Sequence, residues 1–116
     1  MDNEIRKYLY DIQESVYSIE NYLDKHLNGQ RIFFAYMENK MLRRAIEREF
    51  EIIGEAMNRI LKFIPDIPIS AKHQIIGMRN RVVHGYDKID DEIVWGTIVR
   101  HLPILKQDID NLLSNK

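Results

Sequence analysis

Long stretches of this chain contain no residue that would interrupt a helix. The 116 residues include only five glycines and three prolines, and between them apolar residues recur at steps of three and four positions. That spacing is typical of amphipathic helices, which bury one face against a partner. We find no strand-like alternation, no low-complexity tract and no internal repeat. The sequence therefore predicts an all-α fold.

The first half of the chain predicts two long helices. The first spans residues 3–27 and ends at Asn28-Gly29, a pair that accepts the left-handed backbone at a helix C-terminus. The second spans residues 31–64, which is long enough to cross the domain and contact both neighbouring helices. Gly54 lies inside this second helix and is expected to allow another backbone to approach closely.

A short linker follows the second helix. Pro65 and Pro68 each lack an N–H group and restrict the residue before them, so the helix cannot continue through them. Ser70 is expected to cap a third, shorter helix, and Gly85 is expected to end it.

The last predicted helix begins at Asp90, whose carboxylate can cap the first backbone N–H groups. Its apolar residues recur at the spacing of a helix bundle, and Pro103 is expected to bend it or to mark a break after His101. The prediction is an antiparallel four-helix bundle with a long second helix, formed as a single domain over residues 1–116.

Composition limits the function classes. Seventeen Lys and Arg residues against eighteen Asp and Glu give a formal net charge of -1, so any contact with a nucleic acid would have to be local. The absence of cysteine excludes disulfides and thiolate metal sites. No apolar run approaches the roughly 18 residues needed to cross a bilayer. We therefore expect a cytoplasmic protein without a membrane partner.

One segment groups side chains suited to chemistry, namely Arg79-Asn80-Arg81-Val82-Val83-His84-Gly85-Tyr86. An arginine can hold a phosphate with a planar fork of N–H donors, and a histidine can move a proton near neutral pH. On an ideal helix Arg79 and His84 are about 140° apart, whereas Asn80 and His84 are neighbours at i and i+4. Two copies meeting across a twofold axis would supply two imidazoles and two guanidinium groups, which suits acid-base work on a phosphodiester.

Other interpretations of these residues remain open. Arg79 and His84 at a helix end are also typical of a C-terminal cap, and Tyr86 alone is typical of a packing residue with its hydroxyl at the surface. The remaining histidines are scattered and lack ligand spacing, so no metal site is predicted.

A basic run on the second helix has two interpretations. It could follow an RNA strand or contact a protein partner, but glutamates interleave with it, which favours an ion-paired surface. Its basic members are Lys40, Arg43, Arg44 and Arg48. Met78 and Trp95 fall on apolar helical stretches and are expected in the core or at a dimer interface.

The motif segment resembles a known family. Arg79, His84 and Tyr86 reproduce the R-x4-H-x-Y signature of the HepT-like toxins, a branch of the HEPN superfamily of helical nucleases. Further segments are similar to that family in the same order: Ile53-Gly54-Glu55-Ala56, Gly77-Met78-Arg79-Asn80, Ile93-Val94-Trp95 and Leu102-Pro103. Ile69 departs from the family, which is expected to have tryptophan there, and this change should affect packing only.

The resemblance implies a homodimeric ribonuclease that needs no metal or other cofactor and cuts RNA rather than DNA. It assigns His84 as general acid or base, Arg79 as the clamp on the phosphate and the transition state, and Asn80 as the residue that orients the imidazole. The RNA 2′-OH would attack its own phosphate and leave a cyclic phosphate and a free 5′-OH.

The resemblance also implies a partner, a nucleotidyltransferase antitoxin of the MntA type that uses ATP to place AMP on Tyr86. The added charge and bulk would repel and block an RNA phosphate near His84. An alternative is a noncatalytic subunit that presents substrate or nucleotide to such a nucleotidyltransferase. A third reading is a dimeric helical scaffold in which the motif only caps the third helix.

Overall fold

The computed structural model describes residues 2–84 and 90–114. Its first helix, α1 (Asn3–Leu27), begins after Asp2, whose carboxylate accepts the N–H of Glu4 at 2.7 Å. It ends at Asn28, which adopts the left-handed conformation with φ of 54°, followed by Gly29 with φ of 77°. The predicted helix and its terminator are both confirmed, because an Asn-Gly pair tolerates positive φ at little cost.

The predicted second helix is divided in two, which corrects its N-terminal boundary. A short helix, α2 (Phe33–Glu38), is followed by the long helix α3 (Lys40–Phe63). Asn39 separates them in an extended conformation, and its side chain accepts the N–H of Leu42 at 2.9 Å. The asparagine therefore acts as an N-cap, which starts a new helix instead of continuing the old one.

The third helix, α4 (Lys72–His84), begins slightly later than predicted. Ala71 precedes it directly, while the backbone N–H of Ser70 donates to the carboxylate of Asp108 at 2.9 Å. The expected stop at Gly85 lies outside the described residues. Ile75 and Met78 of α4 are buried in the core, as their apolar spacing indicates.

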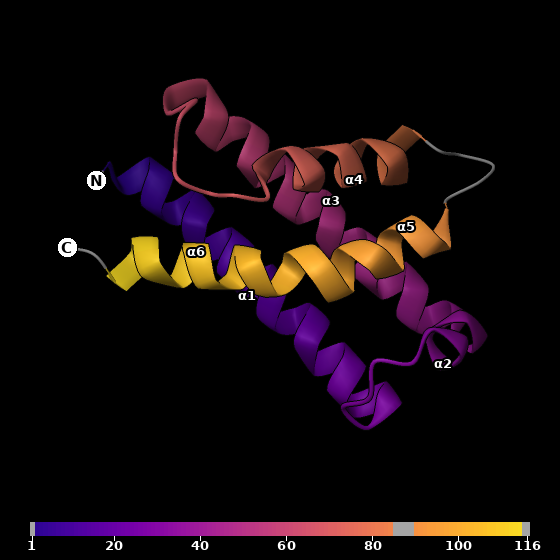
Figure 1. Ribbon diagram of the computed structural model, residues 1–116. Coiled ribbons are helices and arrows are strands. Elements are labelled where there is room, and N and C mark those ends of the chain that lie inside the picture. The colour runs from indigo at the N-terminus through magenta and orange to yellow at the C-terminus, as the bar shows by residue number, and fades with distance from the viewer. Residues whose placement is uncertain (1, 85–89, 115–116) are drawn as a thin grey trace.

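The C-terminal helix changes its hydrogen bonding without stopping. It consists of α5 (Asp91–Gly96), a π-helical turn η1 (Thr97–His101) and α6 (Leu102–Ser114). Figure 1 shows these three segments as one continuous rod. Asp90 caps its start through bonds to the N–H groups of Glu92 and Ile93, as predicted. The wider turn before Pro103 includes an N–H of Leu102 bonded to the carbonyl of Thr97, so the proline produces a π-bulge rather than a break.

Helix α3 is the centre of the arrangement. It packs most extensively against α1 and α4, while α6 lies against α1 and α2 lies against α3 (Figure 1). The described residues form helices and no strand, so the all-α bundle is confirmed. Within that part of the chain, none of the helices combines the length and the apolar character that crossing a membrane requires.

Candidate functional site

Arg79 of α4 lies directly over Gly54 of α3. A Cβ atom added at Gly54 would overlap the Cβ and Cγ atoms of Arg79 and would lie 3.5 Å from its Cα. Only a residue without a side chain allows the two helices to approach this closely. The close approach expected at Gly54 is confirmed, and its partner is the arginine of the motif.

The guanidinium group of Arg79 is held by two neighbours. Its Nη2 atom lies 3.4 Å from Oε1 of Glu55 on α3, and its Nη1 atom donates to Oδ1 of Asn80 at 3.2 Å. Its Nε atom is buried and has no hydrogen-bond partner within the described residues. The side chain of Arg79 is 21% exposed and that of Glu55 is 59% exposed. Both terminal nitrogens of the guanidinium group therefore have partners, and the group is still partly exposed at the surface.

The motif residues are described to different extents. Asn80 is exposed on α4 and accepts the bond from Arg79, an interaction that the sequence did not predict. His84 is the last residue of α4, but its side chain lies outside the described part, and so does the whole of Tyr86. The predicted Asn80–His84 contact therefore stays a prediction.

A groove of about 450 Å³ opens beside Arg79, between α1, α3 and α4. Four cationic and three acidic side chains line it, together with one aromatic ring, which makes it locally basic by a single charge. The charged and aromatic residues are Lys7, Tyr8 and Asp11 of α1, Arg48, Glu51, Glu55 and Arg59 of α3, and Arg79 of α4. Sequence periodicity alone could not reveal this groove, because its walls come from three helices.

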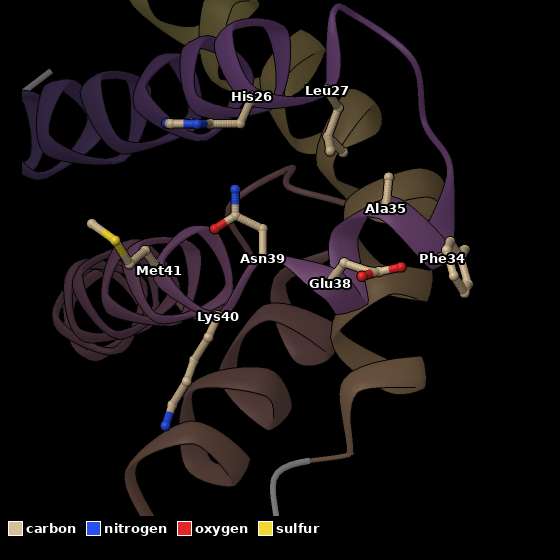
Figure 2. Close-up of a pocket in the computed structure, with 8 residues that line it drawn as sticks. All are labelled: His26, Leu27, Phe34, Ala35, Glu38, Asn39, Lys40 and Met41. Atoms are coloured by element: carbon tan, nitrogen blue, oxygen red, sulfur yellow. The ribbon is translucent and has the colours of Figure 1, made fainter.

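A second hollow of about 540 Å³ lies elsewhere, at the end of α1, on α2 and at the start of α3. Figure 2 shows Leu27 and Ala35 facing one another across it, with Lys40 extending away. Phe34 and Met41 on its rim are largely exposed. None of its lining residues comes from α4, so it is separate from the motif.

A partly buried polar cluster joins α3 to the start of α5. Arg43 and Asp91 form an ion pair at 3.9 Å, and Glu47 beside them is 8% exposed. Burial, with help from the charge of Asp91, raises the pKa of Glu47 above its usual range, while Arg44 and Arg43 lower it. The hydroxyl of Tyr36 is buried here without a hydrogen-bond partner in the described structure. Burial also raises the pKa of that phenol.

Two of the four basic residues of the run on α3 form ion pairs. Arg43 pairs with Asp91, and Arg48 pairs with Glu51 at 3.3 Å.

Trp95 packs against the ring of Tyr36 with centroids 5.0 Å apart, which confirms the predicted packing role.

Comparison with known proteins identifies the family. A family model described as "Ribonuclease HepT-like" matches residues 5–112, which is nearly the whole chain. The chain belongs to the HepT-like ribonuclease family. Its all-α bundle is consistent with the wider HEPN superfamily.

Relatives of this HepT-like chain occur in archaea and bacteria. A protein of Methanocaldococcus jannaschii, named as a candidate RNase, is 30% identical over 97% of this chain and 89% of its own length. A "Probable ribonuclease HepT" of Thermococcus cleftensis is 28% identical over 97% of this chain and 98% of its own. A candidate RNase of Caldanaerobacter subterraneus is 30% identical over 72% of this chain and 76% of its own. No solved structure matches the chain significantly.

Sequence reasoning missed Glu55 as a partner of the motif arginine in this HepT-like protein. Glu55 and Arg79 are 24 positions apart, so no local spacing links them. The available signal was Gly54, because a glycine inside a long helix marks a close crossing and its neighbours then border the partner helix.

Proposed function

We propose that this HepT-like chain is a metal-independent ribonuclease and the toxin of a toxin–antitoxin pair. Family membership supports the ribonuclease activity, and relatives carry that activity in their names. The observation that carries the proposal is the oriented guanidinium of Arg79, which two neighbours hold at the edge of a groove. Such a fork is suited to grip a phosphodiester.

The proposed reaction is a transesterification within the RNA strand. The 2′-oxygen of a ribose bonds to the adjacent phosphorus while the bond from phosphorus to the 5′-oxygen breaks. One histidine accepts the proton of the 2′-OH and another group returns a proton to the 5′-oxygen, so the products are a 2′,3′-cyclic phosphate and a 5′-OH end. We assign His84 to proton transfer and Arg79 to the charge on the phosphate. A homodimer would bring the second His84 into the same cleft.

Regulation is proposed to act through Tyr86. A partner nucleotidyltransferase would transfer AMP from ATP to the phenol oxygen and release pyrophosphate. The new phosphodiester adds negative charge two positions from His84, where it would compete with substrate phosphate for Arg79. Active and silenced forms of the same chain would then differ by a covalent group.

The test is RNA cleavage by purified protein in the presence of a chelator. The wild-type chain should cut a single-stranded RNA and leave cyclic phosphate ends, whereas Arg79→Ala and His84→Ala should each lose roughly a hundredfold or more in rate. Arg81→Ala is the matched control, because Arg81 is an exposed arginine of the same helix and does not line the groove. Full cleavage by His84→Ala would rule out the proposed mechanism.

The modification has its own test. The protein is incubated with ATP and the candidate antitoxin, and its intact mass is measured. An increase by whole AMP units that disappears in Tyr86→Phe supports the proposal. An unchanged mass, or an increase that persists in Tyr86→Phe, excludes Tyr86 as the acceptor.

A further inference from the structure

The groove beside Arg79 contains an aromatic ring with two cations near it. The ring of Tyr8 is half-buried, with Nζ of Lys7 at 5.7 Å from its centroid and Cζ of Arg59 at 5.9 Å. Its hydroxyl donates to the carboxylate of Glu4 at 3.1 Å, which restrains the orientation of the ring. Aromatic rings set among cations are the usual contact surface for unpaired nucleotides, because every base can stack on a ring.

Arg59 differs from the other cations of the groove. Each of the other three forms an ion pair. Nζ of Lys7 lies 3.8 Å from Oδ2 of Asp11. Nη1 of Arg48 lies 3.3 Å from Oε2 of Glu51, and Nη2 of Arg79 lies 3.4 Å from Oε1 of Glu55. These three positive charges are therefore largely matched by carboxylates. Arg59 is exposed and has no carboxylate within ion-pair distance in the part of the chain that the structure describes. The surplus charge of the groove therefore resides on Arg59.

The geometry also relates Arg59 to the motif. Glu55, the partner of Arg79, is one helical turn before Arg59 on α3, a separation of about 6 Å along the axis. A strand gripped at Arg79 that followed the groove along α3 would pass Arg59 and Tyr8, which line the same groove.

We propose that the groove is the path of single-stranded RNA beside the cleavage centre, with Arg59 as a phosphate contact and Tyr8 as a base-stacking platform. Both are positioning residues for substrate rather than catalytic residues. The inference rests on the proposed ribonuclease function, which it deepens by naming where the flanking nucleotides bind. Because stacking does not read the identity of a base, this surface favours unpaired RNA with little sequence preference.

The test separates binding from cleavage. Binding is measured by fluorescence anisotropy with a single-stranded 2′-O-methyl oligonucleotide, which cannot be cut because its 2′-oxygens are blocked. Arg59→Ala should weaken binding about tenfold and lower the dependence of log affinity on log salt by about 0.7, the value for one lost phosphate contact on a single strand. Arg100→Ala is the control, because Arg100 is an exposed arginine of η1 that does not line the groove, and this variant should bind like wild type.

Tyr8 is tested with two variants that keep the fold. Tyr8→Phe retains the ring and should bind within about twofold of wild type, whereas Tyr8→Leu retains apolar volume without a ring and should bind about tenfold more weakly. Thermal unfolding checks that both variants are folded. On cleavable RNA, Arg59→Ala and Tyr8→Leu should raise KM with kcat little changed, since they remove binding away from the reacting atoms.

The outcomes distinguish this inference from the proposed function. If the wild-type chain cuts RNA but Arg59→Ala and Tyr8→Leu bind the oligonucleotide as it does, the groove is not the RNA path and the ribonuclease proposal stands. If binding depends on both residues but no cleavage occurs, the RNA path stands and the ribonuclease proposal fails. Loss of antitoxin binding with unchanged RNA affinity would assign the surface to a protein partner and overturn the inference.

Discussion

Helix α3 makes two large contacts that differ in one respect, because only the contact with α4 includes a charged side chain of the motif. Its contact with α1 belongs to an apolar core in which side chains such as Leu9, Ile12 and Phe50 have no exposed surface. Its contact with α4 also buries apolar side chains, Ile75 and Met78, but it includes a close crossing of Gly54 and Arg79 that ends in a polar contact to Glu55 at the surface. The first contact holds the fold together, and the second positions the group to which we assign phosphate binding. Stability and activity should therefore respond separately to mutation.

The largest expected loss of stability comes from the core. Phe50→Ala removes a fully buried ring and should lower the free energy of unfolding by about 3–5 kcal/mol. Urea unfolding measures that loss, and the rate of RNA cleavage per folded molecule should stay near that of wild type. If the cleavage rate relative to wild type is far below the fraction of molecules that are folded, the contacts of α3 with α1 and with α4 do not affect stability and activity separately.

Gly54→Ala should have the opposite balance of effects. The added methyl group overlaps the stem of Arg79, so α4 must shift, at a stability cost of about 1–3 kcal/mol. A displacement of the Arg79 guanidinium group by about 1 Å should lower the cleavage rate about a hundredfold. Urea unfolding and single-turnover cleavage, measured on the same preparation, give both quantities.

Gly77 provides the matched control on α4, two residues before Arg79. Apart from the backbone of α4 itself and the two adjacent residues, a Cβ atom added there meets no atom of the described residues within 4 Å. Gly77→Ala should therefore stabilise the helix by roughly 0.5–1 kcal/mol and leave cleavage unchanged. If Gly54→Ala and Gly77→Ala lose equal activity, the loss does not depend on the close crossing of α3 and α4 at Gly54.

The buried carboxylate of Glu47 predicts a dependence of stability on pH. The pKa of this carboxyl group is raised in the folded state, so folding favours the protonated form. The carboxylate therefore lowers the free energy of unfolding, and this loss develops as the pH rises from the pKa of the unfolded state through that of the folded state. Glu47→Gln should therefore raise Tm at pH 8 and change it little near pH 4. Arg43, Arg44, Asp91 and Tyr36 face this carboxylate and act on the charged form. A variant that lowers Tm more at pH 8 than at pH 4 would show that the charge stabilises the fold.

The smallest effect is expected at Tyr36. Its hydroxyl is buried without a partner in the described structure, so Tyr36→Phe removes an unsatisfied group and keeps the ring that packs on Trp95. Stability should stay the same or rise by about 1 kcal/mol. A clear loss in thermal unfolding would instead show that the hydroxyl is hydrogen-bonded in solution.

Periodicity and capping residues predicted most of this fold. The bounds of α1 follow from its apolar repeat and from Asn28-Gly29, both of which act locally. The division at Asn39 was missed because apolar residues continue on both sides of it, as Tyr36 and Leu42 do, and hide the cap. The sequence alone does not distinguish an asparagine that continues a helix from one that caps a new helix. The distinction here is the hydrogen bond that Asn39 accepts from the N–H of Leu42.

The candidate site was predictable only in part. The R-x4-H-x-Y signature gave Arg79, and a glycine inside a long helix indicated a close crossing. The pairing of Arg79 with Glu55 and the groove with Tyr8 and Arg59 depend on how three helices are oriented, and that orientation is not encoded in any short spacing.

The central claim is that the planar fork of Arg79, and not merely its charge, carries phosphate binding in cleavage. Single-turnover cleavage by Arg79→Lys tests it most directly, because lysine keeps the positive charge and loses the paired donors. We expect a rate roughly a hundredfold below wild type with an unchanged Tm. Cleavage by Arg79→Lys within twofold of the wild-type rate would contradict the claim.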